Sequence, residues 1–378
     1  MGDSESRAEN EVLSAVALAE SAVADRVFVT QGLELELPST NVFGSRIAVE
    51  WLRDGAPLAR KIGEAHAKGE RVAIVARLAE LIAMRTALAQ IADARLGVVV
   101  HAIADGDGAV SAGYGPAMAL ADLPWGVLLG AGPGDALDLA LAARRAAEDA
   151  SFPFLVVHPR AWVRRYVLPV EPSREILEAF LGGTRFPPNH GNHGTSVGHA
   201  AGFGERVPFA LSSAMRDLET LTGRRRDVFE RAPRADSALA LVGAGAVGDT
   251  LLAEVEGLRA IGHDVCALRL VAWRPFPAAR LVKTLSRVLA MTVLEGPAPA
   301  TSASAPLATH LKAAFADALT WAPDFPGIGC IPRIVSGFVA GHRALDSRDA
   351  QAIVGNMMRH ELGKRSFVLG ESTRDDLE

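Results

Sequence analysis

The hydrophobic positions of the chain form short apolar runs separated by longer segments with helical periodicity. Runs of strand length that are apolar almost throughout occur at 26–30, 71–75, 96–103, 125–130 and 153–159. Strands buried on both faces of a parallel sheet lose the alternation of polar and apolar residues, and the segments between them supply the covering helices. The first half of the chain therefore predicts an α/β domain with a mostly parallel sheet.

A second α/β unit is predicted to begin at residue 237. Strand-like and helical segments alternate there in the order 238–242, 246–261, 264–271, 278–289, 291–296, 306–319 and 347–360. Between the two units, residues 183–206 are rich in Gly, Pro, Asn and His, which disfavours a long regular element. Residues 210–232 are predicted to form a helix. We therefore expect two α/β domains with mostly parallel sheets.

The resulting division of the chain has five parts. We expect a disordered N-terminus at 1–9, a first domain at 10–182, a crossing segment with a linker helix at 183–236, a second domain at 237–362 and a C-terminal tail at 363–378. The acidic N-terminus lacks the basic start and apolar run of a signal peptide, and no run is long enough to span a bilayer. These features predict a cytoplasmic protein that does not bind membranes.

Charge and cysteine content exclude several classes of function. The formal net charge is -5, with 39 basic residues scattered among 44 acidic ones, so we expect no nucleic-acid partner. Cys266 and Cys330 are too few and too far apart for an iron–sulfur cluster within this chain. The histidines of the crossing segment, which are His190, His193 and His199, are interpreted as solvated loop residues, and no metal site is predicted from them.

One motif decides between two functions. Gly243, Gly245 and Gly248 form G-x-G-x-x-G between a predicted strand and a predicted helix, where the helix N-terminus could bind the pyrophosphate of a dinucleotide. The ribose-binding carboxylate expected at the end of the next strand is missing, because Asp264 stands at the start of that strand. We favour a structural turn, with an NAD(P)-binding protein as the alternative.

The second half of the chain resembles the transketolase C-terminal-like domain of 2-oxoacid:ferredoxin oxidoreductases, such as pyruvate:ferredoxin oxidoreductase. The resemblance rests on "GAGAVGDTLLAEVEGLRAIGHDVCALRLVAWRPFP", "VLEG" and "IVSGFVAG". In that family the glycine turn binds no dinucleotide. The prolines of "RPFP" exclude a helix there, so a second structural turn is predicted at Arg274, Pro275, Phe276 and Pro277.

Residues 10–180 resemble the thiamine-pyrimidine domain that precedes it in the family. The matching segments are "NEVLSAVALAES", "PST" and "PAMALADLPWGVLLGAGPGDALDLALAARRAAEDASFPFLVVHP". The resemblance implies an alpha-type component of a complex for oxidative decarboxylation of a 2-oxoacid to an acyl-CoA. It also implies thiamine diphosphate with magnesium, shared with a beta-type thiamine diphosphate/iron–sulfur subunit. A gamma-type subunit and ferredoxin would be further partners.

Thiamine chemistry requires a carboxylate against the pyrimidine ring, and the family's glutamate falls at Gly55 in this chain. Glu50 and Asp54 are the carboxylates that could replace it. The family's Pro-Ser-Thr loop brings Ser39 and Thr40 toward the cofactor, but Leu37 stands where a threonine would meet the substrate carboxylate.

Three further positions depart from the family pattern. Arg77 and Glu80 stand where compact residues line the cofactor, His101 stands near the position of an arginine, and segment 111–118 lacks the expected acidic, His, Ser and Asp groups. Loop side chains carry chemistry while buried faces carry stability, so a fold can outlast its site. We therefore expect a degraded thiamine site and a structural or docking role. The alternative is an active alpha subunit that uses Glu50 or Asp54.

Overall fold

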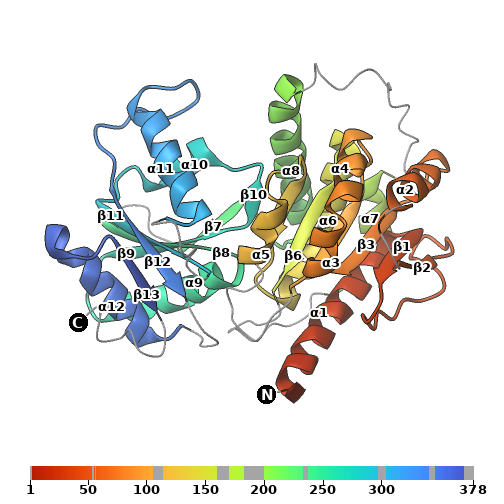
Figure 1. The fold of residues 1–378 in the computed structure, drawn as a ribbon, viewed down its shortest axis with the longest axis horizontal. Coiled ribbons are helices and arrows are strands. Elements are labelled where there is room, and N and C mark those ends of the chain that lie inside the picture. Colours follow the sequence, from red (N-terminus) through yellow and green to blue (C-terminus); the bar gives the residue numbers. More distant parts are fainter. Residues whose placement is uncertain are drawn as a thin grey trace.

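The computed structural model describes residues 2–52, 55, 57–104, 114–159, 170–182, 200–232, 237–296, 304–339 and 345–369. Asp54, the histidines His190, His193 and His199, and the linker residues 233–236 lie outside these ranges. Two α/β domains lie side by side, with the long helix α8 (Ala200–Thr222) on the side of the first domain that faces the second (Figure 1). No helix among the described residues is both long and apolar enough to cross a bilayer.

The first domain contains a seven-stranded sheet with the order β10-β5-β6-β4-β3-β1-β2. Its strands are β1 (Arg26–Thr30), β2 (Ala48–Leu52), β3 (Val72–Arg77), β4 (Val99–Ile103), β5 (Gly126–Leu129), β6 (Phe154–His158) and β10 (Ala272–Arg274). All neighbouring pairs are parallel except β10 with β5. Apart from β10, every strand therefore presents its carboxyl end at the same edge.

Helices cover this sheet. They are α1 (Gly2–Val23), α2 (Leu58–Ala67), α3 (Leu78–Ala83), α4 (Arg85–Asp93), α5 (Tyr114–Ala117), α6 (Pro133–Ala150) and α7 (Arg174–Leu181), with a 3-10 turn at Met118–Leu120. Helix α6 packs between the sheet, α1 and α8, which explains why it is buried along nearly its whole length. Gly132 precedes α6, Pro133 opens it and Asp135 lies in its first turn, an arrangement that suits a helix start.

The second domain contains a six-stranded sheet with the order β13-β12-β11-β8-β9-β7. Its strands are β7 (Phe229–Arg231), β8 (Leu239–Ala244), β9 (Val265–Leu270), β11 (Ala290–Glu295), β12 (Arg333–Val339) and β13 (Ser366–Leu369), and only β7 is antiparallel to its neighbour. Helices α9 (Gly245–Ala260) and α12 (Ser347–Met358) pack together, as do α10 (Ala278–Leu285) and α11 (Pro306–Leu319), on opposite faces (Figure 1). A 3-10 turn follows α12 at His360–Leu362. The predicted fold class, two α/β domains with mostly parallel sheets, is confirmed.

Three parts of the predicted division need correction. Helix α1 already begins at Gly2, within the expected disordered segment 1–9, because its polar residues extend the helix that the apolar positions anchor. Strand β13 lies within the expected tail 363–378, where Phe367 and Leu369 are buried and pair with β12. Strand β10 belongs in sequence to the second domain but completes the first sheet.

Strand β10 joins the two domains through backbone and side chains. Ala272 pairs with Leu128 of β5, and the Leu129 amide donates to the Val271 carbonyl at 2.7 Å. The Trp273 side chain is buried in a core cluster that contains residues of both domains. The turn predicted at residues 274–277 follows β10. Its Arg274–Pro275 peptide bond is cis, and Phe276 packs edge-on against Trp273. Pro277 directly precedes α10.

We expect Gly248→Ala to destabilise the protein, because a Cβ there would lie 2.6 Å from the Gly243 carbonyl oxygen and 2.8 Å from Arg269 Cα. Overpacking against backbone atoms costs about 1–3 kcal/mol. The matched control is Gly257→Ala in the same helix, where a Cβ meets nothing within 4 Å. The control should raise the free energy of unfolding by roughly 0.5–1 kcal/mol, measured by urea unfolding. Equal effects of the two substitutions would contradict this account of α9 packing.

Candidate functional site

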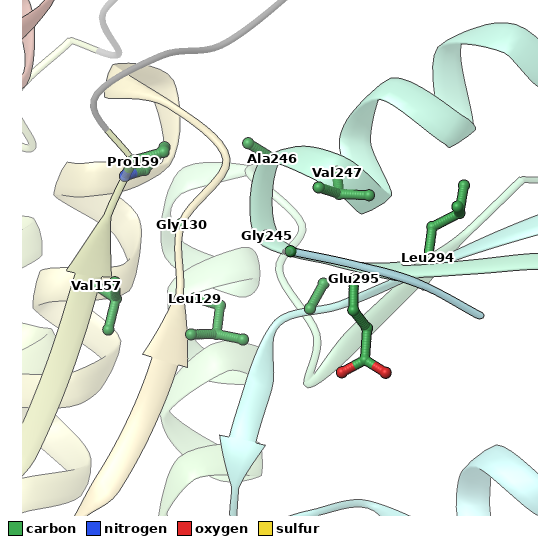
Figure 2. A pocket seen from close by; sticks show the side chains of 11 residues that line it. Leu129, Gly130, Val157, Pro159, Gly245, Ala246, Val247, Leu294 and Glu295 are labelled. Atoms are coloured by element: carbon green, nitrogen blue, oxygen red, sulfur yellow. The ribbon is translucent and has the colours of Figure 1, made fainter. Parts of the chain in front are cut away.

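Ligands of open α/β sheets bind at the carboxyl edge of the strands, so this edge of the first sheet is the expected place for a site. The last residues of its parallel strands there include Thr30, Arg77, Ile103, Leu129 and His158. The second domain approaches this edge at β5 and β6 through the turn at the start of α9 (Figure 2). The candidate site is therefore bounded by both domains.

Two glycine turns, 130–135 of the first domain and 243–248 of the second, face one another at this boundary. Gly245 has a φ of 51°, and a Cβ there would lie 3.0 Å from the Gly130 carbonyl oxygen. The space between the turns is a cavity of about 20 Å³, lined also by Val157 and Pro159 (Figure 2). A cavity of this size holds one or two water molecules. The first domain thus occupies the place where a dinucleotide pyrophosphate would lie, and the glycine turn serves domain packing.

Glu295 also lines this cavity but is engaged elsewhere. Its carboxylate points away from the Gly245 turn (Figure 2) and accepts hydrogen bonds from the Leu307 amide at 2.7 Å and the Ala308 amide at 3.0 Å. Both amides lie in the first turn of α11, where a buried carboxylate satisfies backbone donors that have no partner within the helix. Glu295 therefore stabilises the start of a helix.

Charged side chains cross the domain boundary beside the glycine turns. Arg269 of β9 forms a buried ion pair with Asp135, whose carboxylate also accepts from the Ala131 amide at 2.9 Å. Arg226 lies 3.2 Å from Asp138 and 3.5 Å from Asp135, and Arg224 lies 2.8 Å from Asp138. Burial opposes ionisation of Asp135, but the Arg269 and Arg226 charges outweigh it and hold its pKa below the usual value.

Two predicted site residues, Arg77 and Glu80, come together at the end of β3. The Arg77 amide donates to Glu80 at 3.3 Å, which caps α3. The Arg77 guanidinium donates to Glu9 of α1 at 2.6 Å and to the Gly32 carbonyl at 3.3 Å. Arg77 therefore links α1 and the loop after β1 to the carboxyl edge of the first sheet.

Glu50 lies in the middle of β2 rather than at the carboxyl edge. Its carboxylate forms an ion pair with Arg26 and accepts from Lys61 Nζ at 2.9 Å. The hydrogen bond from Lys61 chiefly lowers its pKa, against the effect of burial and with further help from Arg26. A carboxylate that activates a pyrimidine shares a proton with a ring nitrogen. Glu50 does not fit this role, and Asp54 lies outside the described residues.

The predicted Pro-Ser-Thr loop follows β1 and does not meet the other predicted residues. Leu37 packs against an apolar cluster that includes Val29 and Ile103. Ser39 and Thr40 are exposed; the Ser39 carbonyl accepts from the Ile47 amide at 3.0 Å, and Thr40 forms a β-bridge with Arg46. These contacts fix the shape of the loop, and they indicate a structural role for its described residues.

His101 is fully buried at the centre of a polar chain on one face of the sheet. Its Nε2 lies 2.8 Å from Glu20 of α1, and its Nδ1 lies 2.9 Å from Nε2 of His158. Arg144 of α6 completes the chain, donating to Glu20 at 2.9 Å and to the Val72 carbonyl at 2.6 Å. His101 was a predicted site residue, whereas Glu20, Arg144 and His158 were not.

The hydrogen bonds among Glu20, His101 and His158 fix the tautomers of the neutral histidine rings. An ionised carboxylate only accepts, so His101 Nε2–H donates to Glu20; in the neutral His101 ring, Nδ1 then accepts from His158 Nε2–H. His158 Nδ1 then carries a lone pair, with no hydrogen-bond partner among the described residues. Burial holds the pKa of His158 well below its usual value. The hydrogen-bonded side chains of Glu20, His101 and His158 can pass a proton to one another, but all three are buried from solvent.

Comparison with known proteins gives a consistent relationship. No family model matches the chain. It is 25% identical over 182 residues to pyruvate synthase subunit PorA of Pyrococcus furiosus, covering 43% of this chain and 45% of PorA. It is 30% identical over 117 residues to pyruvate-flavodoxin oxidoreductase of Klebsiella pneumoniae, covering 30% of this chain and 10% of that protein. Over part of its length the chain is therefore similar in sequence to two pyruvate oxidoreductase proteins.

Solved structures extend the likeness in fold over nearly the whole chain. A 2-oxoglutarate:ferredoxin oxidoreductase from Magnetococcus marinus superposes with a TM-score of 0.53 at 12% identity, covering 93% of this chain and 64% of that one. A split-gene transketolase in an inactive beta4 tetramer gives a TM-score of 0.53 at 12% identity, covering 92% and 96%. The chain spans less than half the length of the curated relatives it matches.

The residues that sequence analysis missed carry weak local signals. Glu20 is a buried carboxylate on an otherwise apolar helix face, and His158 ends a run of four apolar residues. A polar residue inside such a pattern signals a buried partner, but the pattern does not name that partner. The partners of Glu20 and His158 come from elements far away in sequence.

We expect Glu20→Gln to destabilise the protein by about 3–5 kcal/mol at pH 7, because it leaves Arg144 buried without its counter-charge. Burial raises the pKa of Glu20, but Arg144 and His101 outweigh it and hold the pKa below 4.5. The stabilisation is thus complete above pH ~4.5 and is lost as pH falls through the lower folded value.

Urea unfolding of wild type and Glu20→Gln between pH 7 and pH 3 measures this difference. The gap between the two proteins should narrow below pH ~4.5. Glu64→Gln, which removes an exposed i,i+4 pair with Arg60, is the control and should change stability by less than about 0.5 kcal/mol. A gap that stays constant with pH would show that the Glu20 charge does not contribute.

Proposed function

We propose that this chain is an alpha-type subunit of a 2-oxoacid:ferredoxin oxidoreductase complex. The complex would convert pyruvate or a related 2-oxoacid to an acyl-CoA by oxidative decarboxylation. The sequence relationship to PorA and the fold shared with a 2-oxoglutarate:ferredoxin oxidoreductase support this assignment. The proposed partners are a beta-type thiamine diphosphate/iron–sulfur subunit, a gamma-type subunit and ferredoxin.

Within this complex the chain would act as a scaffold and docking subunit. The observation that carries this proposal is the engagement of Glu50 by Arg26 and Lys61. Arg77 and His101, at two other positions that the family resemblance assigned to the pocket, are likewise held by Glu9 and Glu20. Side chains held in ion pairs are not available to orient a cofactor.

Thiamine diphosphate with magnesium, where bound, supplies the carbanion that attacks a 2-oxoacid. The described residues do not fit a pyrimidine-activating role, since both oxygens of Glu50 contact cations and the carboxylate sits away from the carboxyl edge. We therefore propose that the cofactor is held chiefly by the beta-type partner. The competing proposal is an active alpha subunit that uses Glu50 or Asp54.

Affinity purification of the tagged full chain from its native host tests the proposal. We expect an iron–sulfur-bearing subunit to co-purify, with CoA-dependent reduction of methyl viologen by a 2-oxoacid. Recovery of the chain without iron and without this activity would overturn the assignment to the complex.

Substitutions in the purified complex separate the scaffold role from an active role. Glu50→Gln and Asp54→Asn should leave turnover within about 2-fold of wild type, because the proposed scaffold role assigns neither carboxylate a contact with the cofactor. Glu70→Gln is the matched control, since Glu70 also pairs with Arg26, at 2.7 Å. A loss of about 100-fold or more in Glu50→Gln or Asp54→Asn alone, in an assembled complex, would establish the active alpha subunit.

A further inference from the structure

A broad basic groove lies on the second domain, and Arg226 in its lining also contacts the 130–135 glycine turn. It has a volume of about 970 Å³ and is formed by the segment 225–231, which includes β7, and by the exposed side of α10 and the residues after it. Six of its lining residues are Arg or Lys and two are acidic. The whole chain has a formal net charge of -5, so this groove has the opposite sign to the molecule.

The acidic residues of the groove are already occupied by structural contacts. Asp227 binds both terminal nitrogens of Arg280, at 2.9 and 2.7 Å, and the same guanidinium lies over the Phe229 ring. Glu230 lies 3.1 Å from Arg269, and Arg226 is turned toward Asp138. Neither carboxylate is left to neutralise the remaining cations.

Three cationic side chains of the groove have no ion-pair or hydrogen-bond partner among the described residues: Arg225, Arg231 and Lys283. All three are exposed. The two neighbours of Arg225, Arg224 and Arg226, point inward to Asp138, whereas Arg225 is exposed. Lys283 lies one turn after Arg280 on the same face of α10.

The remaining chemistry of the groove favours phosphate groups. Guanidinium forks, an ammonium group and the hydroxyl of Thr284 are donors suited to phosphate oxygens. The volume lies within the usual range of small-molecule sites, about 300–1,000 Å³. Phe229 is buried beneath Arg280, so the groove offers neither an apolar anchor for a protein partner nor a free ring for a nucleobase.

We infer that this groove binds a small molecule carrying two or more phosphate groups, held by Arg225, Arg231 and Lys283. The site is independent of the proposed thiamine-complex function. It needs no contribution from a partner subunit, because all its donors belong to this chain.

Isothermal titration of the full chain with sodium tripolyphosphate at low salt tests this inference. The triple variant R225Q/R231Q/K283Q should weaken binding at least about 10-fold, and added NaCl should weaken binding to wild type. The control triple variant K68Q/R348Q/R365Q makes the same charge change at exposed positions outside the groove and should stay within about 2-fold of wild type. Orthophosphate should bind at least about 10-fold more weakly than tripolyphosphate.

Three results would overturn the inference. The first is no measurable binding of tripolyphosphate by wild type. The second is an equal loss in both triple variants, which would indicate attraction by net charge alone. The third is tighter binding of a decaglutamate peptide than of tripolyphosphate, which would assign the groove to an acidic protein. Because all substituted side chains are exposed, matching melting temperatures will verify that each variant is folded.

Discussion

The buried ion pair between Asp135 and Arg269 is the contact on which the arrangement of the two domains depends. Asp135 lies in the first turn of α6, and its carboxylate also holds the Ala131 amide, so the pair fixes the shape of the 130–135 turn. That turn then packs against Gly245, where only a glycine permits the observed approach. The boundary between the two domains is therefore held by three kinds of contact: the Asp135–Arg269 ion pair, the packing of the two glycine turns, and the pairing of β10 with β5.

This constraint explains why the glycine motif of the second domain does not act as a nucleotide site. The start of α9 has the geometry that such a site would use, but its anion-binding end faces protein backbone instead of solvent. Elsewhere, Glu50 and Arg77 are held in ion pairs and His101 in a hydrogen bond to Glu20, at positions where the family resemblance placed a pocket. Buried charges require such partners, because an unpaired one costs several kcal/mol.

Local sequence patterns predicted most of the elements and few of the contacts. The apolar runs identify β1, β3, β4, β5 and β6 because burial on both faces leaves a signal in each strand. Strand β10 is three residues long, and its place in the first sheet depends on a pairing with β5 that its own residues do not encode. The directions of Arg224 and Arg226 are likewise not encoded locally, since only the position of Asp138 shows that these two arginines point inward.

The hydrogen-bonded side chains of Glu20, His101 and His158 show that local sequence patterns also fail to predict the contacts of the candidate site. His101 could be identified from its place in an apolar strand, whereas Glu20 and His158 come from segments 81 and 57 residues away along the chain. Tertiary packing alone brings the three together. The pairing therefore needs the folded structure, even though each residue is visible as a polar exception in its own pattern.

The most direct test of the central claim, that charges across the domain boundary hold the two domains together, is a double-mutant cycle on Asp135→Asn and Arg269→Gln. Urea unfolding followed by tryptophan fluorescence reports on the boundary through the buried Trp273, whose core cluster contains residues of both domains. The account predicts a coupling free energy of at least about 1 kcal/mol between the two substitutions. Effects that add to within about 0.3 kcal/mol would contradict it.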